Sequence, residues 1–148
     1  MRWGRAREKC DFDLWAYVIM PEHVHVLVRP RQACYEIRTI RSALKLLGVS
    51  IHAIRYVRRH APEFLPRCWL TFSLTARSII VSGNAGGGYD RNAFEPATLQ
   101  AMIDYIHNNP VRRGLAASPT DWIWSSARFW SGDKNVPIRM DPLPWLNG

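Results

Sequence analysis

Two histidines separated by a single residue are the first side chains in this chain with a spacing suited to metal chemistry. His23 and His25 open the segment HVHVLVR at residues 23–29, which alternates in the manner of a β-strand. Side chains two residues apart on a strand point to the same side, about 7 Å apart along the backbone. Two imidazoles so placed can converge on one ion, although a lone His-x-His is more often a pair of ordinary half-buried histidines.

A tyrosine and an asparagine four residues apart form the second candidate group. Tyr105 and Asn109 lie in the segment YIHNNP, where helical spacing would put them on one face. A phenol can attack phosphorus and stay covalently attached, and an amide oxygen is a hard ligand that suits Mg²⁺ or Mn²⁺. The alternative is a core tyrosine followed by a helix C-cap. His107 would project about 200° away from Tyr105, so no catalytic role is assigned to it.

The two groups together supply the parts that phosphodiester cleavage needs. A metal ion must polarise the scissile phosphate, and a nucleophile must approach opposite the leaving oxygen. Two strand histidines, a helix tyrosine and an amide one turn later meet these requirements as a set. The combination therefore predicts a nuclease more specifically than either group alone.

The elements that would position these residues follow from local patterns. Residues 12–20, FDLWAYVIM, are rich in aromatic and branched side chains and predict a strand. Pro21 and Glu22 break this run before the second strand at 23–29, so the two strands predict a β-hairpin. Residues 34–60 have helical spacing, with one apolar stripe formed by Ile37, Ile40, Leu44 and Leu47.

The second half of the chain predicts one strand region, one helix and an aromatic tail. Residues 68–82 predict a strand or a strand pair, and a helix is expected from about Pro96 to Asn108, with Pro110 as its stop. We expect the tail to pack back on the core through four aromatic side chains: Trp122, Trp124, Phe129 and Trp130.

Charge and composition point to a polyanionic partner. The chain has 148 residues, enough for a single domain over 1–148, and a net charge of +8 that is carried almost entirely by arginine. Arginine forks onto phosphate, although a basic surface kept for solubility is the alternative. The candidate phosphate contacts are Arg38, Arg41, Lys45, Arg112 and Arg113.

Composition also limits the location of the protein. No run of 18 apolar residues is present, which predicts no membrane association through a spanning helix. The three cysteines form no C-x-x-C pair, and a reducing, cytoplasmic setting is expected.

Two motifs resemble those of a known enzyme family. The segment YVIMPEHVHVLV resembles the HUH motif region of the single-tyrosine transposases, and YIHNNPVRRGL resembles their tyrosine helix, especially in the REP-associated tyrosine transposases. GGGYDRN and DWIWSSARFW also look like segments of that family. The resemblance covers roughly residues 8–60 and 86–131.

The resemblance implies a fold and a mechanism. The fold would be α+β, an antiparallel sheet with helices on one face, as an incomplete ferredoxin-like domain. His23, His25 and Asn109 would hold Mg²⁺ or Mn²⁺, and Tyr105 would attack DNA to give a 5′-phosphotyrosine linkage and a free 3′-hydroxyl. The implied partners are single-stranded or hairpin DNA and, in a homodimer, a second copy of the chain.

The chain departs from the family in two places. Members usually begin with another strand and a longer first helix, whereas only about a dozen residues precede FDLWAYVIM here, too few for both at normal rises per residue. We therefore expect a truncated N-terminus. Residues 80–85, IVSGNA, stand where relatives often have a Phe-Trp-Gln-like stretch, which suggests that about residues 68–85 are translated out of frame.

Two other functions remain open from the sequence. A DNA-binding remnant would keep the basic surface and no longer cut. An unrelated ferredoxin-like RNA-binding module would stack exposed aromatic side chains on bases and need no metal.

Overall fold

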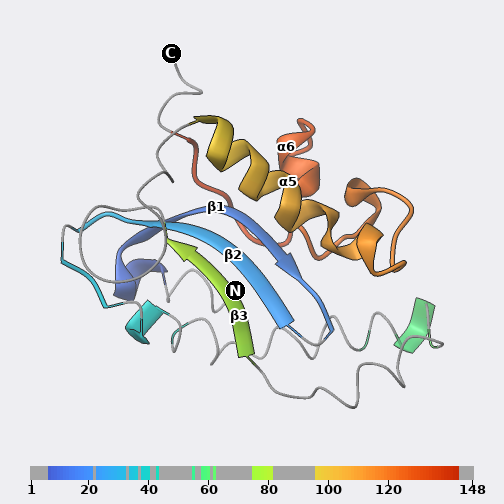
Figure 1. Cartoon of the computed structure of the whole chain (residues 1–148), viewed down its shortest axis with the longest axis horizontal. Helices are drawn as coiled ribbons and strands as arrows, with labels where there is room; N and C mark the ends of the chain where they lie inside the picture. Colours follow the sequence, from blue (N-terminus) through green and yellow to red (C-terminus); the bar gives the residue numbers. More distant parts are fainter. Residues whose placement is uncertain are drawn as a thin grey trace.

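The structure is a computed structural model, which describes residues 7–21, 23–32, 34–36, 38–40, 43, 55, 58–60, 62, 75–81 and 96–143. Of His23 and residues 75–81 it describes the backbone only. Figure 1 shows a small sheet with one main helix beside it. The elements in chain order are the strands β1 (Phe12–Ile19), β2 (His23–Pro30) and β3 (Thr75–Val81), the helix α5 (Pro96–Arg112), the 3-10 turn η2 (Pro119–Asp121) and the short helix α6 (Ala127–Trp130).

The predicted hairpin is confirmed. β1 and β2 pair antiparallel from Phe12 opposite Pro30 to Ile19 opposite Val24, and both strands end within one residue of the predicted bounds. A bulge between Leu14 and Ala16 inserts one extra residue into β1. Aromatic and branched side chains favour this pleated, buried pair.

The third strand does not follow the predicted antiparallel pattern. β3 pairs with β2 in parallel, in the order β1-β2-β3, so the sheet is mixed and the expectation of a wholly antiparallel sheet is wrong. Parallel neighbours require a crossover of a dozen or more residues, and the long connection between β2 and β3 has that length. The described strand, Thr75–Val81, covers only part of the predicted 68–82 region.

Both faces of the hairpin are covered by apolar side chains. On one face, Leu27 and Val18 pack with Leu99, Ile103 and Ile106 of α5. On the other face lies a second cluster of buried residues, which consists of Phe12, Leu14, Tyr17, Ile19, Val26, Val28, Ile40, Ile138 and Met140. Ile40, in the described helical residues 38–40, therefore packs on the face opposite α5, so the expectation that the helices share one face is wrong.

Helix α5 runs beyond its predicted end. Pro110 lies inside the helix, which ends after Arg112 instead of at Asn108. Gly114 has a φ of 72°, and Leu115 N donates to Pro110 O at 2.8 Å while Gly114 N donates to Val111 O at 2.9 Å. These bonds form a Schellman termination, in which glycine takes the left-handed conformation. Pro110 is tolerated because only one helical hydrogen bond near the end is lost.

The C-terminal residues close the outer edge of β1. Ile19 N donates to Trp124 O at 2.8 Å, and Ser126 N donates to Tyr17 O at 3.0 Å. Farther along the same edge, Asp141 N donates to Leu14 O at 3.0 Å. An uncovered strand edge exposes backbone groups that invite aggregation, and this arm satisfies them. The prediction that the aromatic tail packs on the core is confirmed, since Trp122 is buried against the α5 face of β1.

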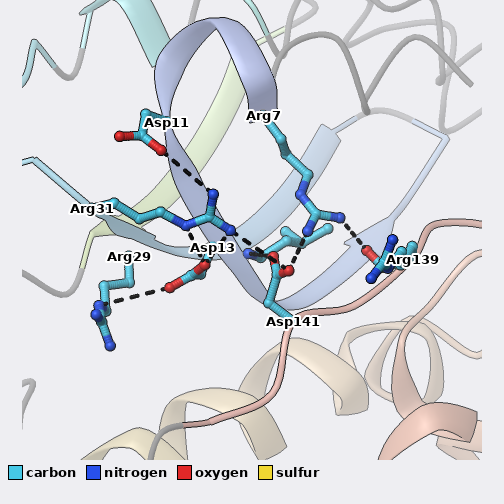
Figure 2. A network of polar contacts seen from close by, with 8 residues as sticks. Arg7, Asp11, Asp13, Arg29, Arg31, Arg139 and Asp141 are labelled. Carbon is cyan, nitrogen blue, oxygen red and sulfur yellow. Dashed lines mark hydrogen bonds and ion pairs between the residues drawn. The ribbon is translucent and has the colours of Figure 1, made fainter.

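A network of arginines and aspartates fixes the far end of this arm (Figure 2). Asp141 accepts a hydrogen bond from Leu14 N at 2.8 Å and forms an ion pair with Arg7. Arg31 binds Asp13 at 2.7 Å and lies 3.9 Å from Asp141. Several arginines of this basic chain are therefore paired with aspartates and serve the fold. In the part of the chain that the structure describes, no helix is long and apolar enough to cross a membrane.

A buried histidine links α5 to the closed edge of β1. His107 Nε2 lies 2.8 Å from Ser126 Oγ, and Ser126 Oγ in turn accepts from Tyr17 N at 2.9 Å. Burial lowers the pKa of His107 to about 4, against a smaller opposing effect of Asp104. The imidazole is therefore neutral at pH 7, which agrees with a structural role.

The neutral state of His107 predicts acid sensitivity of the fold. In the unfolded chain this histidine titrates near pH 6.5, so between about pH 6.5 and about pH 4 only the unfolded state takes up the proton. Above this window the neutral side chain makes its full contribution to the free energy of unfolding. This contribution decreases as the pH is lowered through the window, by at most about 3 kcal/mol. Urea unfolding at several pH values measures this loss.

Two variants isolate the contribution of His107. His107→Gln should flatten the pH dependence across this window, whereas Asn108→Gln, at an exposed position of the same helix, should leave the dependence as in the wild type. Equal pH slopes for the wild type and His107→Gln would contradict the assignment.

Candidate active site

Strand β2 places His25 on the face that α5 covers. His25 lies opposite Val18 of β1, which belongs to the apolar cluster under α5. The side chain of His25 is only 5% exposed. His23 lies in β2 opposite Thr75 of β3, and the structure describes only its backbone.

Helix α5 brings Tyr105 to His25. The two ring centroids are 5.8 Å apart and the planes meet at 78°, an edge-to-face contact. Tyr105 is 45% exposed, and among the described residues it is the one exposed large hydrophobic side chain. A core tyrosine would be enclosed, as Tyr17 is, so the alternative of a core role for Tyr105 does not fit this position.

Asn109 is buried one turn later, and its amide group has a structural task. Its Nδ2 donates to Tyr105 O at 2.8 Å and to Ile106 O at 3.4 Å. Ile106 O is the carbonyl that loses its usual helical partner because Pro110 has no N–H. The amide nitrogen must face these two acceptors, which leaves Oδ1 as the group with the capacity to bind a cation.

One of the predicted phosphate contacts lies directly at the tyrosine. The guanidinium of Arg112 stands over the Tyr105 ring, with its carbon 5.4 Å from the centroid. Arg113 and Arg38 are also exposed, whereas Arg41 and Lys45 lie outside the described residues. Of the three candidate contacts that the structure describes, Arg112 is the one seen in contact with Tyr105.

The donor set is compatible with a divalent cation but incomplete within the described residues. His25 offers an imidazole, a ligand that zinc and nickel favour, and Asn109 offers an amide oxygen, a hard ligand that suits Mg²⁺ and Mn²⁺. Within the described part of the chain, no group of three or more His, Cys, Asp or Glu side chains gathers around one point. A cation here would therefore depend on His23, as the sequence predicts.

Comparison with protein-family models, with curated proteins and with solved structures finds no match to this chain. The candidate site is therefore supported by its own geometry and by the motifs in the sequence.

Two features of the site were missed by the sequence analysis. Tyr105 and Arg112 are seven residues apart, which places them on nearly the same side of a helix. This spacing would have predicted their contact if the helix had been expected to continue past Pro110. The second feature is the hydrogen bond from the Asn109 amide to the carbonyl freed by Pro110. It could be recognised only because the structure shows that Pro110 lies inside the helix.

The bonds of Asn109 predict a measurable contribution to stability. Asn109→Ala removes the donor to Ile106 O and should lower the free energy of unfolding by about 1 kcal/mol or somewhat more. Asn108→Ala provides the matched control, because Asn108 is exposed and its single bond to Asp104 O lies on the solvent side. Urea denaturation of both variants, without added metal, checks the difference, and equal losses would contradict the structural task of Asn109.

Proposed function

We propose that this chain cuts and rejoins single-stranded DNA through Tyr105, in the manner of the single-tyrosine HUH transposases that its motifs resemble. The observation that carries the proposal is the contact between the exposed Tyr105 ring and the buried His25 ring. Residues some 80 positions apart in the chain meet on one face of the hairpin, and they are the two types that the proposed chemistry requires.

The reaction conserves the number of phosphodiester-type bonds. The phenolic oxygen of Tyr105 forms a bond to phosphorus, and the bond from phosphorus to the 3′ oxygen of the preceding nucleotide breaks. The phenol proton passes to solvent, and the leaving 3′ oxygen takes a proton from solvent to become a 3′-hydroxyl. In rejoining, a 3′-hydroxyl attacks the phosphotyrosine and releases Tyr105, so no energy source is required.

His23, His25 and Asn109 are the residues proposed to hold Mg²⁺ or Mn²⁺. A cation bound there would polarise the scissile phosphate and offset the charge that develops on it. The chain itself excludes water from one side of the site, since His25 is buried and Ile103 and Ile106 of α5 pack beneath. Tyr105 is itself exposed, so a DNA strand can approach it from the solvent.

A second candidate function is a DNA-binding remnant that no longer cuts. The observation that favours it is the pair of hydrogen bonds from Asn109 Nδ2 to two backbone carbonyls. These bonds give Asn109 a structural role that requires no metal. The remnant would still bind DNA through exposed arginines such as Arg112 and Arg113.

The fold and partners are proposed on the same basis. The antiparallel hairpin with α5 on its histidine face supports a transposase-like α+β domain, whereas the parallel pairing of β3 with β2 departs from the antiparallel sheet of a ferredoxin-like fold. For a homodimer, the outer edge of β1 is an unsuitable interface, because its backbone groups at Leu14, Tyr17 and Ile19 already bind the C-terminal arm. Single-stranded or hairpin DNA is the proposed substrate.

Covalent capture tests the proposal. Random-sequence single-stranded oligonucleotides carrying a 3′ label are incubated with the protein and Mn²⁺ or Mg²⁺ and separated under denaturing conditions. A 5′-phosphotyrosine product keeps the label on the protein, so the wild type and Tyr35→Phe should both show an adduct. Tyr105→Phe should bind the same DNA, unfold at the same temperature and show no adduct, and His25→Ala should reduce the adduct strongly.

Each outcome separates the candidate functions. An adduct in Tyr105→Phe would reject Tyr105 as the nucleophile. DNA binding without any adduct in the wild type would reject the nuclease and favour the remnant.

Binding to single-stranded DNA is predicted to weaken as salt increases, because arginines at phosphates release counterions. Arg113→Ala should reduce the slope of log K against log salt by about 0.7, the value for one contact on a single strand. Lys134→Ala, in the loop after α6, should leave the slope as in the wild type. Fluorescence anisotropy at several salt concentrations measures these slopes, and a wild-type affinity independent of salt would exclude an electrostatic interface.

A further inference from the structure

The Tyr105 ring has a second neighbour besides His25. The Arg112 guanidinium carbon lies 5.4 Å from the ring centroid, within the range of a cation–π interaction. Both side chains are exposed, so the pair lies at the surface beside the buried histidine. Seven residues of helix correspond to almost two full turns, which explains why the two side chains meet.

Arg112 differs from other arginines of the chain in its partners. Arg7, Arg29 and Arg31 are each paired with an aspartate near the hairpin end (Figure 2). Among the ion pairs of the described residues, none includes Arg112, whose recorded contact is the tyrosine ring. No carboxylate among the described residues therefore pairs with its positive charge, which is available to an anionic ligand at the place where Tyr105 would react.

The chemistry of guanidinium allows both contacts at once. Its planar face can stack on an aromatic ring while its N–H groups, which lie in the plane, donate two parallel hydrogen bonds to phosphate oxygens. A lysine ammonium has one point charge and no planar face, so it can attract phosphate but cannot hold a ring in the same way. Arginine stays protonated, so it transfers no proton in the reaction.

We propose that Arg112 is a positioning residue that stacks on the Tyr105 ring, limits its rotation and binds the same DNA phosphate that Tyr105 attacks. This inference rests on the proposed function. It assigns to Arg112 a geometric role beyond the general attraction of a basic surface for DNA. Replacing arginine by lysine separates the two effects, since the charge remains and the stacking face is lost.

The experiment compares Arg112→Lys, Arg112→Ala and Lys134→Ala with the wild type, using the 3′-labelled single-stranded oligonucleotides. Adduct formation is followed against DNA concentration, which gives a half-saturating concentration and a rate at saturation. Arg112→Lys should keep the wild-type half-saturation but lose at least about tenfold in rate, as for removal of a positioned group in an active site. Arg112→Ala should raise the half-saturating concentration and lower the rate at saturation, and Lys134→Ala should change neither quantity.

A measurement without DNA reports the contact directly. In protein labelled with fluorotyrosine, the Tyr105 resonance is identified by its absence in Tyr105→Phe, and it should shift in Arg112→Ala and remain in place in Lys134→Ala. A wild-type rate in Arg112→Lys would overturn the positioning role, and an unshifted resonance in Arg112→Ala would overturn the contact. If the wild type itself forms no adduct, the proposed function fails and the positioning role falls with it, whatever the resonance shows.

Discussion

The packing of α5 on the histidine face of the hairpin is the interaction on which the candidate site depends. Leu99, Ile103 and Ile106 form the apolar side of the helix and join the cluster that includes Leu27. Since each residue turns a helix by about 100°, this seam fixes where every other side chain of α5 points. Tyr105 consequently reaches the exposed rim beside His25, and His107 turns inward towards Ser126.

The C-terminal arm stabilises that arrangement from the side. It closes the edge of β1 through backbone bonds to Ile19, Tyr17 and Leu14, and Ser126 within it also contacts His107 of α5. The helix is thus attached to the hairpin both by an apolar seam and by a buried polar link. Because Asp141 and the arginines around it hold the end of the arm, part of the basic character of the chain has a structural explanation.

Local patterns predicted the hairpin well, and long-range pairing poorly. The break at Pro21 and the alternation in HVHVLVR were sufficient to predict β1 and β2 nearly to the residue. The parallel pairing of β3 had no local signal, because parallel partners are joined by long connections.

The end of α5 was mispredicted because proline was treated as a stop, whereas the Asn109 amide compensates the freed carbonyl and Gly114 ends the helix. The meeting of His25 with Tyr105 was expected from a family resemblance and not from spacing alone. Predictions for Arg41, Lys45 and the glycine-rich segment at 86–92 lie outside the described residues.

The central claim, that Tyr105 is the nucleophile beside the strand histidines, is tested most directly by locating the DNA on the protein. The captured complex is treated with nuclease to leave a short nucleotide remnant, digested with trypsin and analysed by mass spectrometry. Cleavage after Arg91 and Arg112 releases a peptide from Asn92 to Arg112, in which Tyr105 is the one tyrosine. The account predicts that the nucleotide remnant is attached to this peptide, at Tyr105. A remnant attached instead to a peptide carrying another tyrosine, such as Tyr89 or Tyr56, would contradict it.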